Sequence, residues 1–287
     1  MKIFIAIVIS SLFLSCTSTG DKKQVQATVP LQKNDLELMS LKGKVKQMRD
    51  VKYAVIKKDS LNDKGARKDS IVYYFNEHGN KAEIKAYKPG SNLCWKSTFK
   101  YDENARKVEM TSYKPNDSVD WKVIYLYNGN GKKIEQNGFN GLGKPEEKSS
   151  FKYDGDGYII EEYKFKADGR LYFKSKYHND STGKIIEERR YKAYGSLDWK
   201  YTWQYDQHGN AIETNWIKPD GSLMGKDTYK YDEHGNKIER KAYHSDGSFE
   251  TQFTYKYIYD RNLNWIKKTE FENNVPILIC ERTFEYY

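Results

Sequence analysis

Long stretches of the chain alternate strictly between hydrophobic and polar residues. In LDWKYTWQY (197–205), every second residue is leucine, tryptophan or tyrosine, and the residues between are polar. The same pattern recurs in Leu93–Tyr101 and Phe249–Tyr259. A period of two with aromatic enrichment is typical of a β-strand and not of a helix. Most such segments lead into D-x-x-G-N or a close variant, where aspartate bonds its own backbone and glycine supplies a positive φ. The pattern therefore predicts strands closed by tight turns.

The strand and its turn belong to a repeated unit. Eight related segments begin at residues 75, 101, 127, 153, 177, 205, 231 and 259. The spacing is 26 residues, except that the fifth segment begins two residues early and the last begins two residues late. Each unit also holds a second strand pattern, such as Lys237–Tyr243, and a second turn, such as KPDGS at Lys218–Ser222. We expect an all-β fold in which about eight antiparallel two-strand repeats form an extended, twisted or curved sheet of about sixteen strands or more. No segment after the N-terminal apolar run has a helical pattern.

Three positions recur within the units. A glutamate follows an aliphatic residue at Glu109, Glu135, Glu161, Glu187, Glu213 and Glu239. A large residue, mostly aromatic, follows four residues later, at Tyr113, Phe139, Phe165, Tyr191, Ile217 and Tyr243. An aromatic residue usually stands two positions before the turn tyrosine, as at Phe99, Tyr125 and Trp203. Repeated positions stack in neighbouring units, so we expect aromatic ladders and cross-strand pairs of glutamate with lysine. The glutamates could also suggest glycoside hydrolysis, but a residue repeated in nearly every unit fits a structural role better.

The first residues carry a targeting pattern. Lys2 precedes an apolar run from Ile3 to Leu14, which is too short to span a bilayer and has the anatomy of a secretory signal peptide. The run ends in FLSC at Phe13–Cys16, which resembles the lipobox of bacterial lipoproteins. That resemblance implies cleavage before Cys16 and acylation of this cysteine, which would anchor the chain to a membrane. The alternative is an ordinary secretory peptide with an incidental cysteine.

These patterns predict the organisation of the chain. We expect a lipoprotein signal peptide at 1–15, a flexible tether at 16–40 and one β-repeat domain at 41–287. Within that domain, 41–74 would be N-terminal cap strands, 75–258 the repeats and 259–287 a C-terminal unit. Thr17 is not the aspartate that retains some lipoproteins at the inner membrane. The expected location is therefore the cell outer membrane, facing either the periplasm or the surface.

Charge and cysteine content narrow the partners. The formal net charge is +9, but the lysines are scattered among glutamates and aspartates with no long basic run. We therefore expect no nucleic-acid partner; the charge favours solubility or contact with anionic envelope components. Apart from Cys16, only Cys94 and Cys280 are present, so no disulfide framework is expected. They could pair, but two buried free thiols are the preferred expectation.

The signature Y-D-x-x-G-N-x-I-E resembles the YD repeat of RHS-type proteins. Tyr205–Asn210 and Tyr231–Asn236 are the best copies, and the resemblance covers about residues 73 to 287. In large RHS and insecticidal-complex toxins such repeats build a β-sheet shell around a toxin domain, and in cell-surface relatives they are associated with adhesion to carbohydrate or protein. The resemblance implies binding or envelope architecture rather than chemistry.

The segment YDEHGN contains three neighbouring side chains that could bind metal or transfer protons. His78, His208 and His234 occupy one repeat position, which Asn104, Asn130 and Asp156 fill in other units. All are short polar residues that turns tolerate. We therefore interpret Tyr231, Asp232, Gly235 and Asn236 as a turn motif and predict no metal site, cofactor site or catalytic residue. No catalytic or nucleotide-binding motif is present.

Three tryptophans form the candidate binding surface. Trp95, Trp121 and Trp199 stand six residues before their turn tyrosines, at equivalent positions. If their face is open they form a ligand-stacking face; if it is covered they are core, which the strict alternation favours. We expect a non-catalytic, membrane-anchored binding or structural lipoprotein that recognises a polysaccharide or an envelope protein. The alternatives are an accessory factor of a secretion or toxin system and, less favoured, a glycan-acting hydrolase.

Overall fold

The computed structural model describes residues 33–58 and 61–287. This part of the chain contains one short helix and eighteen strands. They are α1 (Asp35–Leu38), β1 (Val45–Lys58), β2 (Leu61–Phe75), β3 (Lys81–Tyr87), β4 (Leu93–Tyr101), β5 (Lys107–Tyr113), β6 (Val119–Tyr127), β7 (Lys133–Asn140), β8 (Pro145–Tyr153), β9 (Ile159–Lys166), β10 (Leu171–Asn179), β11 (Ile185–Lys192), β12 (Leu197–Tyr205), β13 (Ala211–Ile217), β14 (Leu223–Tyr231), β15 (Lys237–Tyr243), β16 (Phe249–Tyr259), β17 (Trp265–Glu272) and β18 (Val275–Tyr286).

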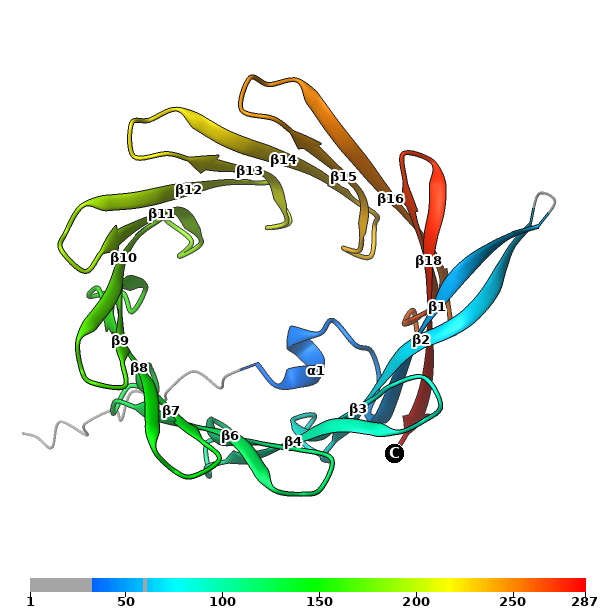
Figure 1. The fold of residues 1–287 in the computed structure, drawn as a ribbon, viewed down its shortest axis with the longest axis horizontal. Helices are drawn as coiled ribbons and strands as arrows, with labels where there is room; N and C mark the ends of the chain where they lie inside the picture. The colour runs from blue at the N-terminus through cyan, green and yellow to red at the C-terminus, as the bar shows by residue number, and fades with distance from the viewer. Residues whose placement is uncertain (1–32, 59–60) are drawn as a thin grey trace, which may run out of the picture. The chain divides into compact units, whose positions relative to one another are not determined.

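All eighteen strands belong to one antiparallel sheet, and each pairs with the strands before and after it in the sequence. The sheet closes because β1 pairs with β18 as well as with β2, over a register running from Val45 opposite Tyr286 to Ala54 opposite Leu278. Figure 1 shows the resulting closed barrel of strands. Closure leaves neither terminal strand with an unpaired edge.

The all-β antiparallel fold is confirmed, but the expected extended, open sheet is not. The segments assigned as N-terminal cap strands and as C-terminal unit supply β1 and β18, which are direct neighbours. The sequence defines each hairpin locally, whereas closure depends on the twist and curvature that accumulate over all strands.

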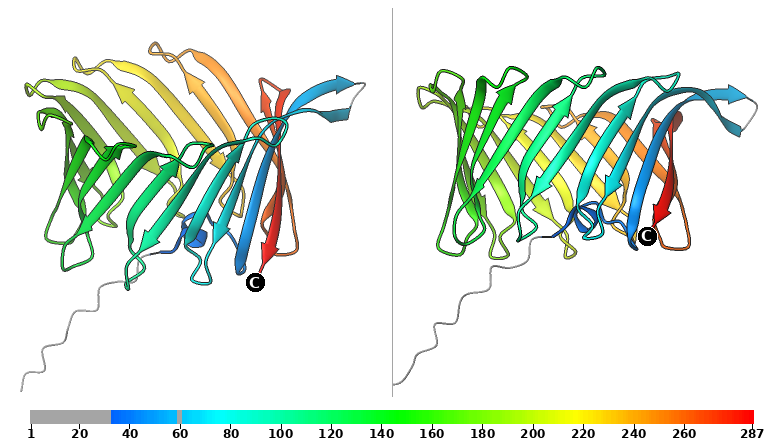
Figure 2. Two further views of the ribbon diagram at one scale, coloured as in Figure 1. Left: turned by 60° about the horizontal axis from the view of Figure 1, so that its bottom comes forward. Right: turned by 90° about the horizontal axis from the view of Figure 1, so that it is seen from below.

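The turns lie at two rims of the ring, because consecutive strands run in opposite directions (Figure 2). The turns after the repeated tyrosines, such as 232–236, lie at the rim where α1 lies and where the backbone of Leu36 bonds Gly79. We call this the α1 rim. The other turns, such as 218–222, lie at the opposite rim, which we call the far rim.

The two faces of the sheet differ in chemistry. Helix α1 lies inside the ring (Figure 1), and Asp35 of α1 contacts Tyr101 and Lys107, which marks the inner face. Lys100, the neighbour of Tyr101, and its cross-strand partner Glu109 therefore point outward.

On this outer face the ammonium groups of Lys100 and Lys122 lie 2.8 and 2.7 Å from the Glu109 carboxylate. Partial burial alone would raise the pKa of Glu161, but hydrogen bonds from Lys174, Tyr163 and Lys152 lower it to about 2. The expected cross-strand pairing of the repeated glutamates with lysines is confirmed.

The repeated tyrosines join each unit to the previous one on the inner face. In each case the phenol donates to a backbone carbonyl 20 residues earlier, at 2.7 to 3.0 Å. The pairs are Tyr101 with Lys81, Tyr127 with Lys107, Tyr153 with Lys133, Tyr205 with Ile185 and Tyr231 with Ala211. In the last unit Tyr257, two residues before the turn tyrosine Tyr259, makes the equivalent bond to Lys237. The tyrosine position thus supplies a hydrogen bond between hairpins as well as apolar surface.

Helix α1 corrects the prediction that no helix follows the N-terminal apolar run and that the tether extends to residue 40. Asn34 and Glu37 form a capping box, each accepting a hydrogen bond from the other's backbone N–H at 2.9 Å. Leu36 and Leu41 pack with Val45, Met48 and Phe75 in a small buried cluster. The part of the expected tether that lies at 16–32 falls outside the described residues. Within the described chain no helix has the length and apolar character to cross a membrane.

Candidate functional site

The inner face carries the tryptophans. Cross-strand pairing places Trp95 opposite Ala86, Trp121 opposite Ser112 and Trp199 opposite Arg190 on this face. Trp203 and Trp216 face the same way, on β12 and β13. Trp95 and Trp216 remain 37% and 39% exposed, so solvent reaches the inner face at these rings. An exposed tryptophan on a rigid strand is a ready contact surface for a ligand.

Four aromatic side chains of β12 and β13 form one cluster on the inner face. The Tyr201 ring lies parallel to the Trp216 ring, with centroids 6.0 Å apart and an interplanar angle of 4°. Trp203 stacks on the same tyrosine at 5.7 Å, and Trp199 meets it edge-on at 5.0 Å. The cluster forms because alternate residues of β12 share one face and Trp216 lies directly across from Tyr201. We call these four residues the aromatic cluster.

A pocket of about 340 Å³ adjoins the aromatic cluster and runs toward the far rim. Gly225 lies opposite Trp216 and adds no side chain beside its ring. Polar groups stand at the border, where Arg240 lies 3.0 Å from Asp227 and Tyr229 donates to that aspartate at 3.2 Å. Burial raises the pKa of Tyr229, so its phenol stays a neutral donor. The lining residues are Tyr201, Thr214, Trp216, Met224, Gly225, Lys226, Asp227, Arg240, Ala242, Tyr243, His244 and Glu250.

This arrangement suits a ligand with flat apolar faces and hydroxyl groups at its edges. The exposed face of Trp216 offers an apolar platform, and the Asp227–Arg240 pair offers acceptors and donors held in fixed directions. Sites for small molecules are typically concave and mostly apolar, with a few placed polar groups. A pyranose ring has both features.

The structure separates the three predicted tryptophans. Trp95 and Trp121 lie on β4 and β6, whereas Trp199 lies six strands further round the ring, on β12. Only Trp199 belongs to the aromatic cluster, and Cζ of Arg190 lies 4.4 Å from the centroid of its ring. Trp121 lies over Gly138, where a Cβ atom would overlap its ring. The three side chains share a face, but they do not form one platform.

The sequence does not by itself single out Tyr201, Trp203 and Trp216 as site residues. The alternation in 197–205 placed Trp199, Tyr201 and Trp203 on one face, which was a usable signal. Trp216 gave none, because its position in the unit holds Ala86, Ser112 and Ala242 in other repeats. Its pairing with Tyr201 depends on the register between strands.

The YDEHGN segment forms a tight turn at the α1 rim. Asp232 accepts hydrogen bonds from the backbone N–H groups of His234 and Asn236, at 3.0 and 2.8 Å, and Gly235 adopts a φ of 79°. The His234 ring packs edge-on against Tyr259, whose hydroxyl donates to Asp232 at 2.5 Å. Among residues 33–58 and 61–287, no group of three or more histidine, cysteine, aspartate or glutamate side chains is placed to hold a metal ion.

Two inward carboxylates lie outside the repeated glutamate position. Glu162 accepts a hydrogen bond from Tyr177 at 3.0 Å, and Glu188 accepts one from Ser175 at 2.7 Å. They flank β10 on either side, since Glu162 lies opposite Ser175 and Glu188 opposite Tyr177. In the sequence, Glu162 and Glu188 each follow a repeated glutamate directly, and nothing else there indicates that their side chains point inward.

The two cysteines within the described residues are both free. Cys280 on β18 is buried, which raises the pKa of its thiol, while Cys94 on β4 is only half-buried. Ring closure brings β18 within four strands of β4, although the two cysteines lie far apart in the sequence. Cys16 lies outside the described residues.

The sequence matches no family model and no curated protein. Among solved structures, a porin-like protein from Bacteroides uniformis matches with 12% identity and a TM-score of 0.43, covering 84% of this chain and 96% of that one. A porin-like protein from Bacteroides vulgatus matches with 14% identity and a TM-score of 0.38, covering 85% and 98%. The Tc holotoxin pore of Photorhabdus luminescens matches with 12% identity and a TM-score of 0.29, covering 76% of this chain and 15% of that one. At these identities and TM-scores, no property of those proteins is transferred to this chain.

Proposed function

We propose that this chain is a non-catalytic envelope lipoprotein that binds a glycan at the aromatic cluster on its inner face. The observation that carries the proposal is the exposed Trp216 ring, stacked parallel to Tyr201 beside the Asp227–Arg240 pair. The proposed location is the outer membrane, supported by the resemblance of Phe13–Cys16 to a lipobox.

The cluster is prepared for a ligand because its geometry is already fixed. Tyr201 is held by its strand neighbours Trp199 and Trp203, so Trp216 rests on an ordered ring rather than on a mobile side chain. Stacking on such a ring adds about 0.5–1.5 kcal/mol beyond the area it covers. With the covered area included, loss of the Trp216 ring should weaken binding about tenfold or more, since each 1.4 kcal/mol changes an affinity tenfold.

The test is titration of neutral and acidic polysaccharides and their oligosaccharides into the mature protein, followed by tryptophan fluorescence and calorimetry. Trp216→Ala should bind any glycan that the wild type binds about tenfold or more weakly. Trp95→Ala is the matched control, because Trp95 is equally exposed on the same face but lies on β4. Binding lost equally in both variants, or no glycan bound by the wild type, would refute the assignment.

The lipid anchor has its own test. Cells expressing the full chain are fed a labelled fatty acid, and Cys16→Ala should abolish the label. Undiminished labelling would contradict acylation of Cys16.

A glycan-acting hydrolase stays a second candidate, because Glu162 and Glu188 lie on the inner face and Glu188 lies opposite Tyr201 of the aromatic cluster. Two carboxylates flanking a sugar are the usual requirement for glycoside hydrolysis. Release of reducing ends from a bound glycan, abolished by Glu162→Gln or Glu188→Gln, would establish that activity and overturn the non-catalytic proposal. The other alternative, an accessory role in a secretion or toxin system, predicts a protein partner instead of a glycan.

A further inference from the structure

The outer face carries an apolar pair at the far rim of every hairpin from β3/β4 to β17/β18. In the hairpins from β3/β4 to β15/β16 this is the last cross-strand pair before the turn, and in β17/β18 one more pair, Glu272 with Val275, follows it. The pairs are Tyr87 with Leu93, Tyr113 with Val119, Phe139 with Pro145, Phe165 with Leu171, Tyr191 with Leu197, Ile217 with Leu223, Tyr243 with Phe249, and Phe271 with Pro276. We call these sixteen residues the far-rim belt.

Exposed apolar side chains continue the belt into the turns. Leu142 and Tyr194, at turns of the far rim, are 83% and 78% exposed, and Phe249 of the belt is 53% exposed. Tyr172 and Val275, beside two further turns, are 58% and 42% exposed. These residues lie on five hairpins between β7/β8 and β17/β18 rather than on one hairpin, so the exposed apolar surface follows this part of the far rim.

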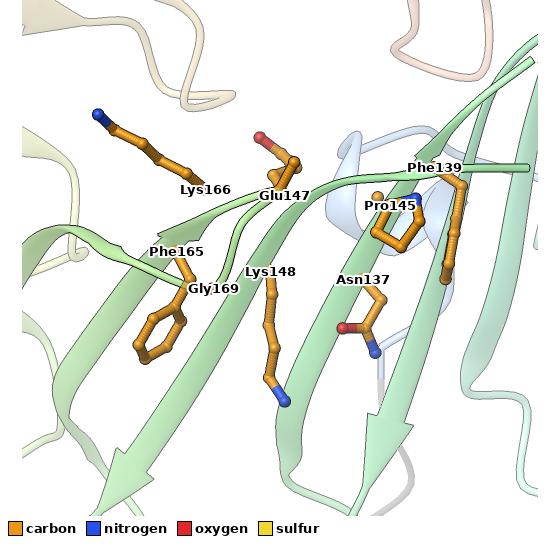
Figure 3. A pocket seen from close by; sticks show the side chains of 10 residues that line it. Asn137, Phe139, Pro145, Glu147, Lys148, Phe165, Lys166 and Gly169 are labelled. Atoms are coloured by element: carbon orange, nitrogen blue, oxygen red, sulfur yellow. The ribbon is translucent and has the colours of Figure 1, made fainter.

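The belt is also hollowed between neighbouring hairpins. A pocket of about 380 Å³ has Phe139 and Pro145 on one side and Phe165 on the other, with Lys148 between them (Figure 3). A second pocket of about 350 Å³ is lined by Phe139 together with Val119 and Ile124 of β6. Aromatic ridges therefore alternate with apolar hollows along this part of the belt.

Lysines stand over the aromatic rings of the belt. Lys96 lies 5.2 Å from the centroid of Tyr113, and Lys226 lies 5.0 Å from that of Tyr243. Lys256 is placed likewise, 5.2 Å from Phe271. Aromatic residues flanked by lysine are enriched where proteins meet the headgroup region of a bilayer, because the ring enters the interface and the ammonium reaches phosphate.

Several acidic residues near the far rim are neutralised. Asp117 pairs with Lys96 at 2.6 Å, and Asp168 pairs with Arg170 at 2.7 Å. Asp120 and Asp198 lie 3.6 Å from Lys114 and Lys192. These carboxylates therefore oppose an anionic surface less than isolated ones would.

We propose that the far rim docks on the surface of an anionic lipid bilayer through the far-rim belt. A belt that runs around one end of a ring can meet a flat surface with all its hairpins at once, whereas a folded protein partner would cover only some of them. The contact stops at the rim, because the middle of the outer wall carries the lysine–glutamate pairs around Glu109 and Glu161, which are costly to place in hydrocarbon. This contact adds to any anchor at Cys16 and does not depend on glycan binding.

The test uses the mature chain from residue 16 onward with Cys16→Ser, so that no acyl chain contributes. Binding is measured by flotation with vesicles of phosphatidylethanolamine and phosphatidylglycerol, and with vesicles of phosphatidylcholine alone. The belt variant combines Leu142→Ser, Tyr194→Ser and Phe249→Ser. The control variant combines Leu126→Ser, Ile258→Ser and Leu263→Ser, which are 44%, 54% and 54% exposed but lie toward the α1 rim. Circular dichroism melting confirms that both variants fold.

The expected result is binding to the anionic vesicles, weaker binding to the neutral ones, and about tenfold weaker vesicle binding by the belt variant than by the control variant. Equal loss in both variants would overturn the assignment to the far rim. Absence of wild-type binding would overturn the bilayer as occupant. If the wild type self-associates without vesicles and only the belt variant stays monomeric in ultracentrifugation, the belt is instead an interface between two copies of the chain.

Discussion

Replacement of Asp35 by asparagine tests how helix α1 is fixed to the inner face. The Asp35 carboxylate accepts the backbone N–H of Lys81 at 3.0 Å and the Tyr101 hydroxyl at 2.7 Å. The ammonium groups of Lys81 and Lys107 lie 3.3 and 3.8 Å from it. No other residue of α1 joins so many groups of the sheet, so its charge should dominate the docking of the helix.

The magnitude follows from the burial of these groups. The Asp35 side chain is only 7% exposed, and the side chains of Lys81 and Lys107 are 19% and 28% exposed. Asparagine keeps the shape and one acceptor oxygen, but it turns two bonds to a charged acceptor into neutral ones, each weaker by about 1–1.5 kcal/mol. We expect docking to weaken by about 2–3 kcal/mol, an increase of about 30- to 150-fold in the opening equilibrium.

Amide hydrogen exchange with mass spectrometry measures this opening directly. The protected amides are those of Leu36, bonded to Gly79, and Leu41, bonded to Leu36. They should exchange faster in Asp35→Asn, while the amides of β12 keep their wild-type rates. Glu37→Gln is the matched control on the same helix, because glutamine still accepts the capping bond from Asn34.

The pH dependence gives a second check. Burial alone would raise the pKa of Asp35, but the Lys81 N–H, the Tyr101 hydroxyl and the two ammonium groups together lower it. The contribution of Asp35 is therefore complete above the ordinary carboxyl pKa of about 3.9 and is lost as the pH falls through the lower folded value. The difference between wild type and Asp35→Asn should persist at pH 7 and pH 5 and shrink in stronger acid. Equal exchange at pH 7, or equal opening in Glu37→Gln, would refute the charge-based account.

Two further predictions concern the wall of the ring. Tyr231→Phe removes the hydroxyl that donates to the Ala211 carbonyl at 2.8 Å, and should lower the free energy of unfolding in urea by about 1 kcal/mol. The control is Tyr194→Phe, because the Tyr194 side chain is exposed. Equal losses of unfolding free energy in the two variants would contradict a stabilising role for the hydrogen bond between units. Gly138→Ala places a Cβ atom against the Trp121 ring and 2.8 Å from Cγ of Glu147, and should cost about 1–3 kcal/mol and shift tryptophan emission. Gly129→Ala, where a Cβ atom meets nothing within 4 Å, should leave both measurements unchanged, and an unchanged Gly138→Ala variant would show that the wall adapts to the added methyl group.

Local features of the fold could be predicted from the sequence because they depend on neighbouring residues. The strand Leu197–Tyr205 follows from alternation, and the Asp232 turn follows from the bonding habits of aspartate and the positive φ of Gly235. The pairing of Glu109 with lysines follows from the repeat, since equivalent positions on neighbouring hairpins lie side by side. The capping box of Asn34 and Glu37 also depends only on neighbouring residues, so the sequence contains the signal for it, although the segment around it is polar.

The candidate site could be predicted only in part. The sequence indicated that Trp199 and its aromatic neighbours share a face, and that Trp95 and Trp121 occupy the equivalent position. It did not indicate that Trp216 would lie across from Tyr201, because that contact depends on the register of β12 and β13. The inward direction of Glu162 and Glu188 depends likewise on the alternation that follows the irregular pairing at each turn.

The sequence by itself determined the repeat, its strands and turns, and which residues share a face, because these follow from a period of two and from the chemistry of the turn residues. Only the tertiary structure decided that β18 returns to β1 and that the tryptophans line the inside while the large apolar pairs encircle the far rim. The physical reason is that an alternating strand defines two faces but does not say which is concave. The concave face is determined by the curvature of the whole sheet, and that curvature accumulates over all eighteen strands.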